Sequence, residues 1–336
     1  MIFDSFDTFR TALRDLPRPD ADARAAAEAR NAQLTKPAGS LAMLEDLAAW
    51  LAAWQGTERP HVDAPQVAIF AGNHGVCAQG VSAYPPEVTV QMVAGFEAGF
   101  AAINQLAKLH GAQLSVHPIE LDRPTADFTQ GPAMSEAETL EALRIGWEAV
   151  DPKADLFIAG EMGIGNTTPA AALSAALLGG NAGDWTGRGT GVDDAGLRRK
   201  EAAVAAGLAR HNDSDDALQT LARLGGREIA AMAGAIAGAR AARVPVLLDG
   251  FICCAAAIVL EKAAPGTLAH CRAGHLSAEG AHARQLEALG LTPILSLGLR
   301  LGEGSGAATA LGVVRAAAAC QSGMATFAEA GVSTGE

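Results

Sequence analysis

Aromatic residues are scarce in this sequence. Phe, Trp and Tyr together make up 4% of the 336 residues, with a single tyrosine, whereas hydrophobic residues make up 49%. Much of that apolar content is alanine, which favours close-packed helices over a core of bulky rings. A chain of this length can bury a large core, so we expect one dominant domain with an appendage.

The sequence also lacks an excess of basic residues and a long uninterrupted apolar run. Its formal net charge is −12, which disfavours duplex nucleic acid and anionic membrane surfaces as partners, because both select basic faces. The most hydrophobic stretch, residues 244–260, is interrupted by Asp249 and Gly250. It is therefore too short and too polar to span a bilayer. We predict no nucleic-acid partner and no membrane association.

Several motif classes are missing as well. The five cysteines form no C-x-x-C pair, and the first residues are acidic where a secretory signal needs positive charge. We therefore expect reduced thiols and a cytoplasmic location. The histidines do not stand at metal-ligand spacing, so we predict no metal, and we expect no cofactor. The absence of a G-x-S-x-G elbow and of a G-x-x-x-x-G-K-S/T loop disfavours the commonest hydrolases and NTPases.

Apolar runs alternate with helical segments of ten or more residues along most of the chain. This alternation predicts an α/β fold with a doubly wound, mostly parallel sheet and helices on both faces. Residues 1–58 are expected to form a helical segment of a small domain, joined by residues 321–336 at the C-terminus. Residues 59–320 are expected to form a Rossmann-like α/β catalytic domain.

Local signals place several helix boundaries. Ser40 is expected to cap the helix that ends near Trp54, and Ser135 with Glu138 forms a capping box. A single long helix is predicted to open near Glu87 and to continue to about Lys108.

Small polar loops follow four of the expected strands, at residues 72–75, 160–163, 249–250 and 302–304. The carboxyl ends of parallel strands meet at one edge of a sheet, where open α/β sheets bind their ligands. We therefore expect the functional site to be assembled from these four loops.

The stretch from Asp155 to Leu178 is expected to form a strand, a glycine loop and a helix that begins just after Asn166, with Thr168 as a plausible N-cap. Backbone N–H groups at such a helix start form an anion site, and Gly163 and Gly165 let the main chain approach a ligand. A phosphate would suit this loop. The order of the glycine spacings does not fit the dinucleotide fingerprint, which disfavours NAD.

A second glycine-rich loop, residues 187–194, precedes a helix that Asp193 can cap. Lys200 lies in the second turn of that helix. The loop could grip a phosphate or a ribose, or it could be an ordinary glycine turn.

Two glutamates stand in glycine-rich loops, Glu161 after Gly160 and Glu303 between Gly302 and Gly304. The flanking glycines would let the backbone pass close to a ligand while the carboxylate projects into the cleft. Such a pair could divide acid–base and electrostatic roles. The alternative is two loop glutamates in ordinary water-filled turns.

Together these motifs resemble the nicotinate-nucleotide:dimethylbenzimidazole phosphoribosyltransferase family over roughly residues 30–320. The motifs that carry the resemblance are Gly72-Asn-His-Gly-Val, Gly80-Val-Ser-Ala-Tyr-Pro, Gly160-Glu-Met-Gly-Ile-Gly-Asn-Thr-Thr, Gly189-Thr-Gly-Val-Asp and Leu301-Gly-Glu-Gly-Ser-Gly-Ala. The resemblance implies transfer of a phosphoribosyl group from nicotinate mononucleotide to 5,6-dimethylbenzimidazole, with nicotinate and α-ribazole 5′-phosphate as products. It also implies a homodimer.

The same resemblance implies roles for individual residues. Glu303 would be the general base and Glu161 would support it. The implied substrate-binding residues are Ser82, Tyr84 and Gln91 for the acceptor ring, Gly163, Gly165, Asn166 and Lys200 for the phosphate, and Gly189 and Gly191 in the second glycine loop.

Two other functions stay open at this point. One is a phosphoribosyltransferase of the same fold that accepts another base. The other is a nucleotide-binding sensor without catalytic activity, although the presence of both glutamates disfavours it.

Overall fold

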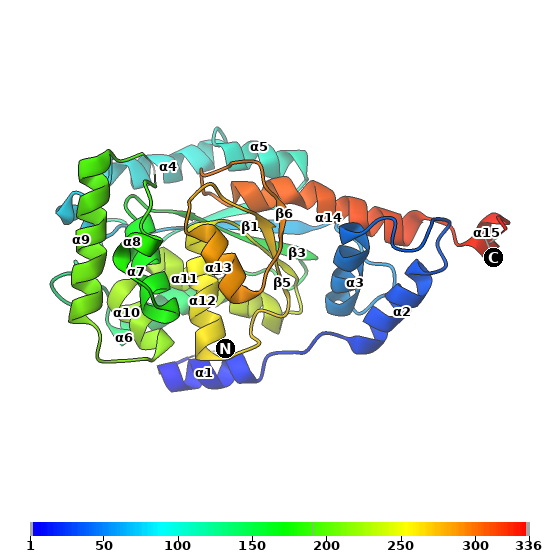
Figure 1. The fold of residues 1–336 in the computed structure, drawn as a ribbon, viewed down its shortest axis with the longest axis horizontal. Coiled ribbons are helices and arrows are strands. Elements are labelled where there is room, and N and C mark those ends of the chain that lie inside the picture. The colour runs from blue at the N-terminus through cyan, green and yellow to red at the C-terminus, as the bar shows by residue number, and fades with distance from the viewer. Residues whose placement is uncertain (1–2, 190, 334–336) are drawn as a thin grey trace.

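Six parallel strands form one sheet at the centre of the computed structural model, which describes residues 3–189 and 191–333 (Figure 1). The strand order is β2-β1-β3-β4-β5-β6, and every neighbouring pair runs parallel. The strands are β1 (Pro65–Ala71), β2 (Gln113–Pro118), β3 (Leu156–Met162), β4 (Val246–Leu248), β5 (Cys271–His275) and β6 (Pro293–Leu295). The predicted α/β fold with a parallel sheet is confirmed.

Helices cover both faces of the sheet (Figure 1). They are α1 (Phe6–Arg14), α2 (Ala21–Asn31), α3 (Met43–Gln55), the 3-10 helix η1 (Gly75–Gln79), α4 (Glu87–Ala98), α5 (Ala102–Leu109), α6 (Glu136–Glu148), α7 (Thr167–Leu178), α8 (Ala182–Trp185), α9 (Asp194–Arg210), α10 (Ala217–Leu224), α11 (Arg227–Ala241), α12 (Phe251–Ala263), α13 (His282–Leu289), α14 (Ser305–Gly323) and α15 (Phe327–Ala330). Among the described residues, no helix combines the length and the apolarity needed to cross a membrane.

Successive side chains of a strand point to opposite faces, and this alternation divides the buried core in two. Ala68 and Phe70 of β1 belong to a cluster that includes residues of α6, α7, α11 and α12. Val67 and Ile69 belong to a second cluster, with residues of α3, α5 and α14. Both faces of β1 and β3 are therefore buried, as expected for the central strands of a parallel sheet.

Glycine allows two helices of the first cluster to approach closely. A Cβ atom on Gly146 of α6 would lie 1.7 Å from the carbonyl oxygen of Ala231 in α11, and one on Gly234 of α11 would lie 1.9 Å from that of Leu143. The abundance of small residues in the sequence thus serves helix contacts that leave no room for a larger side chain.

We expect Gly234→Ala to lower the free energy of unfolding by about 3 kcal/mol, because the added methyl group forces α6 and α11 apart. Gly323→Ala, at the exposed end of α14, is the matched control, since no atom of the described residues lies within 4 Å of its Cβ position. That control should be neutral or slightly stabilising. Urea denaturation of both variants checks the prediction, and equal midpoints would contradict it.

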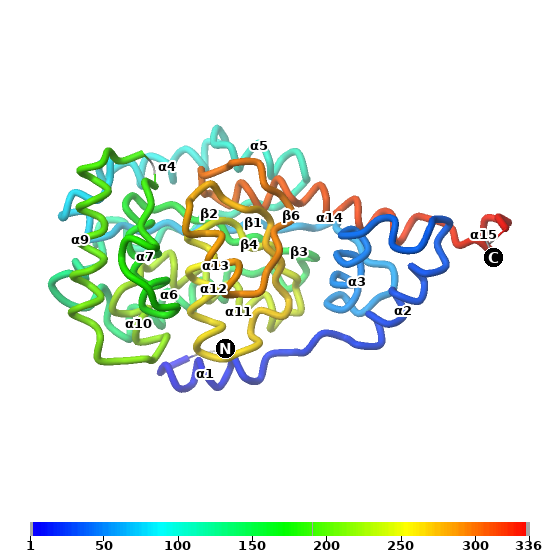
Figure 2. Tube along the Cα trace, in the orientation of Figure 1, coloured from blue at the N-terminus to red at the C-terminus, as the bar shows by residue number. Residues whose placement is uncertain are grey.

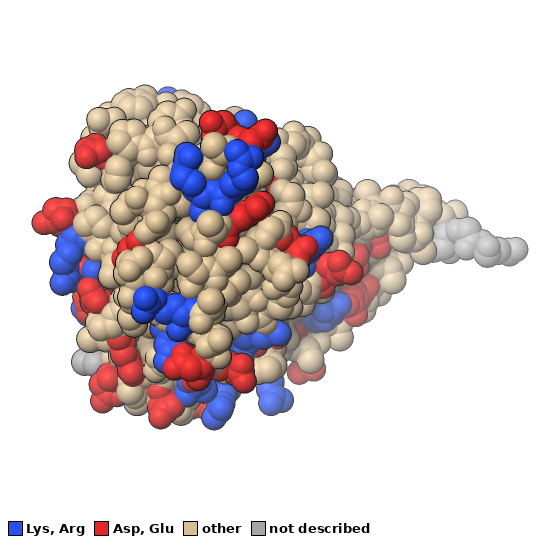
Figure 3. Space-filling view, turned by 60° about the vertical axis from the view of Figure 1, so that its left-hand side comes forward, with Lys and Arg blue, Asp and Glu red and all other residues tan. Residues whose placement is uncertain are grey.

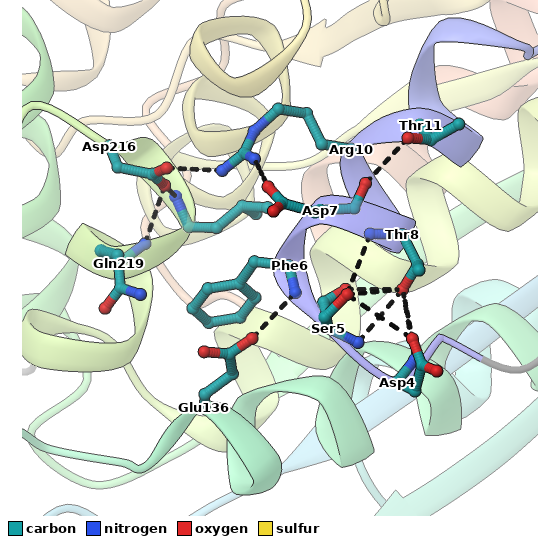
Figure 4. Close-up of polar contacts among 11 residues, drawn as sticks. Asp4, Ser5, Phe6, Asp7, Thr8, Arg10, Thr11, Glu136, Asp216 and Gln219 are labelled. Carbon is teal, nitrogen blue, oxygen red and sulfur yellow. Dashed lines mark hydrogen bonds and ion pairs between the residues drawn. The ribbon is translucent and has the colours of Figure 1, made fainter.

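The N-terminal helix α1 packs on the α/β body, on the first cluster. Phe6, Phe9 and Leu13 of α1 are buried there. In Figure 4 the N–H of Phe6 donates to Glu136 at 2.9 Å, and Arg10 bridges Asp7 and Asp216. These contacts attach α1 to the first turn of α6 and to the start of α10.

Helices α2 and α3 instead lie beside the C-terminal part of α14, at one end of the molecule (Figure 2). The chain end pairs with the segment before α3, since the N–H of Thr35 donates to the carbonyl of Ala325 at 3.0 Å and that of Phe327 to Gln33 at 2.9 Å. Leu47 and Leu51 of α3 also share the second cluster with the sheet. The predicted domain division at residue 58 stays a prediction. Of the two chain ends assigned to the small domain, residues 1–2 and 334–336 lie outside the described residues.

Three local predictions are wrong. The helix expected to run from Glu87 to Lys108 breaks between Gly99 and Ala101, and two helices, α4 and α5, take its place. Helix α3 begins at Met43 without a side-chain cap, so Ser40 is not its N-cap. Helix α7 begins at Thr167, and its N-cap position is occupied by Asn166 rather than Thr168. The capping box of Ser135 with Glu138 and the Asp193 cap of α9 are confirmed.

Acidic and basic side chains are interspersed on the face of the molecule drawn in Figure 3, between broad areas of uncharged residues. No single sign of charge dominates that face.

Candidate active site

A cavity lies at the carboxyl edge of the central strands. Glu161 and Gly163 line it from the end of β3, Asp249 from the end of β4 and His275 from the end of β5. Glu303 lines it from the loop before α14. Three of the four loops expected to form a site therefore meet in one cavity.

The backbone around Glu303 is held in an uncommon conformation. Glu303 has φ 64° and stands between Gly302 at 87° and Gly304 at 78°, all in the left-handed region that residues with a side chain avoid. Glu303 was expected at the end of the last strand, but β6 ends at Leu295, so the glutamate lies in the loop of residues 296–304. Such strain in a loop is a common mark of a functional residue.

This loop brings the two glutamates together. A Cβ atom on Gly302 would lie 2.3 Å from Oε1 of Glu161, and one on Gly160 would lie 2.6 Å from the carbonyl oxygen of Glu303. The backbone N–H of Glu303 also donates to the Glu161 carboxylate. The glycines in both motifs are thus required where the two loops touch.

The carboxyl group of Glu161 is buried. Its Oε2 accepts a hydrogen bond from Nδ2 of Asn166 at 2.5 Å. Burial raises the pKa of Glu161 to about 8, and the charges of Asp249 and Glu228 act in the same direction, against the hydrogen bonds from Asn166 and Glu303. A carboxyl group with such a pKa holds its proton near neutral pH.

The raised pKa predicts a pH-dependent stability. The folded protein binds a proton at Glu161 that the unfolded chain releases near pH 4.5, so this group's contribution to stability falls as pH rises from about 4.5 to about 8. Glu161→Gln removes the titration, and we expect its unfolding free energy to fall less over that range than that of the unmodified protein. Urea denaturation at pH 5 and pH 8 measures how far the unfolding free energy of each protein falls between these two pH values. An equal fall in the two proteins would contradict the raised pKa.

The Glu303 side chain is 6% exposed. Burial raises its pKa, whereas the backbone N–H of Ile103, in the first turn of α5, acts to lower it. That N–H is available because the helix breaks before Ala102, which gives α5 a free first turn. Among the described residues, Oε2 of Glu303 has no hydrogen-bond partner.

The loop after β3 supplies part of the cavity wall. Gly163, Asn166 and Thr167 line it. At the start of α7 the N–H of Asn166 donates to the carbonyl of Gly163 and that of Thr168 to the carbonyl of Gly165, and Pro169 has no N–H. Gly165 faces away from the cavity, because a Cβ atom there would lie 2.6 Å from Sγ of Cys77. Gly165, with φ 86°, shapes the turn.

Lys200 reaches the same loop from α9. It is 1% exposed, and its Nζ donates to Oγ1 of Thr167 and to the carbonyl oxygen of Gly187, both at 2.8 Å. Burial lowers the pKa of Lys200 to about 8, against the opposing effect of the Glu279 charge. A Cβ atom on Gly189 would lie 3.1 Å from Nζ, so the second glycine loop lies directly against this lysine.

The remaining residues of the predicted site lie outside the cavity lining. Gly191 has no atom of the described residues within 4 Å of its Cβ position, and Thr190 lies outside the described residues. Tyr84 and Gln91 are exposed and Ser82 is half-buried. The role of these three in binding an acceptor ring stays a prediction.

Sequence reasoning missed several residues that line the cavity, among them His275, Glu279 and Arg300. His275 Nε2 lies 3.5 Å from Oδ1 of Asp249, which also accepts the N–H of Ala307 at 2.9 Å. His275 and Glu279 belong to β5 and the turn after it, a strand that the sequence analysis did not recognise, and Arg300 lies in the loop before α14. Among the described residues, no cluster of three or more His, Cys, Asp or Glu side chains could hold a metal ion.

Comparison with known proteins gives a consistent result. A family model described as phosphoribosyltransferase matches residues 16–332. The nicotinate-nucleotide–dimethylbenzimidazole phosphoribosyltransferase of Ruegeria pomeroyi is 66% identical over 97% of each chain, and that of Mesorhizobium japonicum is 59% identical over 99% of each. A crystal structure of the Thermus thermophilus enzyme is 45% identical, with a TM-score of 0.88 over 94% of this chain and 100% of that chain.

Proposed function

Because the chain belongs to the nicotinate-nucleotide–dimethylbenzimidazole phosphoribosyltransferase family, we propose that it moves a 5-phosphoribosyl group from nicotinate mononucleotide to 5,6-dimethylbenzimidazole. The products are nicotinate and α-ribazole 5′-phosphate. The observation that carries this proposal is the contact between the Gly160–Glu161 and Gly302–Glu303 loops, which brings two buried carboxyl groups to one cavity.

In the proposed reaction one benzimidazole nitrogen attacks C1′ of the ribose while the bond from C1′ to the pyridinium nitrogen breaks. Nicotinate leaves as a neutral ring nitrogen, so it needs no strong acid. The other benzimidazole nitrogen loses its proton to Glu303, whose Oε2 has no partner among the described residues. Attack from the face opposite nicotinate inverts the configuration from β to α.

Glu161 supports the base through the backbone. Its carboxyl group accepts the N–H of Glu303 and is held in turn by Asn166. These two hydrogen bonds fix a loop whose conformation is otherwise unfavourable.

The donor phosphate would bind at the start of α7. Gly163, Asn166 and Thr167 face the cavity there, and Lys200 lies within hydrogen-bonding distance of Thr167. The buried lysine beside this wall offers a phosphate positive charge and charge-assisted hydrogen bonds.

The test is transfer itself. The purified protein is incubated with nicotinate mononucleotide and a panel of bases that includes 5,6-dimethylbenzimidazole, plain benzimidazole and adenine, and the nucleotides formed are identified by mass. We expect α-ribazole 5′-phosphate. A different preferred base would support the alternative of a related transferase, and no nucleotide product with any base would support a non-catalytic sensor.

A homodimer is the second part of the proposal. Large apolar side chains are exposed on α4, on α5, in the turn between them and in the loop before α14, at the upper side of Figure 1. Phe100 is 69% exposed and Leu109 is 73% exposed, and Val90, Leu297 and Leu301 are also exposed. Exposed apolar side chains on neighbouring elements can mark an interaction site when they form one patch.

We expect Phe100→Glu to shift the protein from dimer to monomer, because a charge at the centre of an apolar interface loses its hydration. Met43→Glu is the matched control, an exposed apolar residue at the start of α3. Light scattering after size-exclusion chromatography measures both masses. A dimer that survives in Phe100→Glu would place the interface elsewhere.

A further inference from the structure

Glu279 is a buried acidic residue of the cavity, and the proposed reaction assigns it no role. It lies in the turn between β5 and α13, lines the cavity and is 9% exposed. Among the described residues, its Oε1 has no hydrogen-bond partner. A buried carboxylate that receives no hydrogen bond from the described residues is costly, so a donor that a ligand supplies to its other oxygen, Oε2, would be favoured.

The turn that carries Glu279 is fixed by a chain of buried hydrogen bonds. The N–H of Glu279 donates to Oγ of Ser277 at 3.2 Å, and the N–H of Ser277 donates to Nδ1 of His282 at 2.9 Å. Burial lowers the pKa of His282 to about 4, so the ring is neutral and keeps a lone pair at Nδ1. Its Nε2, 3.2 Å from Sγ of Cys254, then carries the proton. Glu279 is thus held in a prepared position.

The opposite wall also leaves room for this carboxylate. A Cβ atom on Gly187 would lie 1.5 Å from Oε1 of Glu279 and 3.4 Å from Oε2. Oε1 is therefore packed against the loop at 187, and Oε2 is the oxygen left to meet a ligand. The carbonyl of Gly187 binds Lys200, and the charge of Glu279 acts on that lysine. Glu279 therefore stands next to the proposed phosphate site.

A carboxylate next to a phosphate site needs a ligand group that donates a hydrogen bond. In the proposed substrates the phosphate and the nicotinate carboxylate are anions without donors, and the acceptor N–H is assigned to Glu303. The other acids are engaged, since Asp249 accepts the N–H of Ala307 and Glu161 binds Asn166. The two ribose hydroxyl groups are the donors that remain.

We infer that Glu279 accepts a hydrogen bond from a ribose hydroxyl of the nucleotide donor and makes the enzyme selective for ribonucleotides over deoxyribonucleotides. This inference rests on the proposed function. A site built to bind a hydroxyl rejects the analogue that lacks it, because the buried acceptor is then left unpaired.

The experiment compares three donors: nicotinate mononucleotide and its 2′-deoxy and 3′-deoxy analogues. The enzymes are the unmodified protein, Glu279→Gln, Glu279→Ala and Glu287→Gln, an exposed glutamate on α13 that serves as the matched control. We expect the unmodified protein to prefer the ribonucleotide over one deoxy analogue by about 10–100-fold in kcat/KM. Glu279→Ala should lower kcat/KM for the ribonucleotide and leave that analogue nearly unchanged, so that the preference disappears.

Glu279→Gln keeps an acceptor oxygen without the charge and should retain part of the preference, while Glu287→Gln should retain all of it. Calorimetric binding of the same nucleotides gives the ratio of dissociation constants even where turnover is low. If Glu279→Ala keeps the preference for the ribonucleotide, or if it lowers kcat/KM equally for all three donors, the role of Glu279 is overturned and the proposed function stands. No transfer from the ribonucleotide by the unmodified protein would overturn both.

Discussion

Glu303→Gln is expected to lower turnover by ~10²-fold or more with saturating substrates, while the affinity for the acceptor is nearly kept. Glutamine preserves the shape of the side chain and can still face the N–H of Ile103, but it cannot take the proton that the benzimidazole must lose. Both residues have a side chain beyond Cβ, so the strain at φ 64° is the same in the two proteins. The variant therefore isolates proton transfer from loop geometry.

The measurement is turnover set beside thermal unfolding of the same preparations. Glu287→Gln, on the surface of α13, controls for the loss of one carboxylate at a distance from the cavity. A glutamate with a purely structural role would lower the melting temperature and leave the turnover of the folded fraction intact. Normal turnover in Glu303→Gln would move the base to Glu161.

The pH profile offers a second check on the same group. Because burial raises the pKa of Glu303, the ionised base forms at higher pH than for an exposed glutamate. Activity limited by this group should accordingly rise with pH through that raised pKa.

Lys200→Met is expected to lower kcat/KM for nicotinate mononucleotide by about 10²-fold, mainly through a higher donor KM, because a charge-assisted hydrogen bond to the phosphate is lost. Methionine fills most of the buried volume of the lysine, whereas Lys200→Ala would also leave a cavity. Both variants should show the same kinetic loss if the charge is what matters.

Nicotinate riboside is the diagnostic substrate for this prediction. It lacks the phosphate, so the unmodified enzyme should use it far less well than the nucleotide, and the Lys200 variants should use it about as poorly. Lys153→Ala, an exposed lysine before β3, controls for the loss of one positive charge. Equal use of riboside and nucleotide by the unmodified enzyme would remove Lys200 and the start of α7 from the phosphate site.

The sequence was sufficient for the fold and for the two glutamates because both depend on short-range patterns. Alternating strands and helices define a parallel sheet, and glycines beside an acidic residue indicate a loop whose backbone passes close to another group. The structure shows which group each loop approaches. Gly302 makes room for the side chain of Glu161, and Gly160 makes room for the backbone of Glu303, so the two motifs pack on each other.

The residues that sequence reasoning missed depend on long-range contacts. His275 is the last residue of the five-residue strand Cys271–His275, and Glu279 lies in the turn after it. The strand includes an arginine and a glycine, and nothing local marks it as a strand. The helix break before α5 was missed for a similar reason. Gly99 ends α4 in the left-handed conformation, but a lone glycine in a helical pattern also occurs within unbroken helices.

The anchoring of Glu303 has a consequence for motion in the molecule. Glu303 lies in a loop that follows the edge strand β6, which is three residues long and only partly buried, yet its carbonyl packs against Gly160 in the central strand β3. Amide protons of β6 can therefore exchange with solvent during local openings at the sheet edge, while those of β3 exchange only when the whole core opens. We therefore expect local opening of the sheet edge to leave the position of Glu303 unchanged.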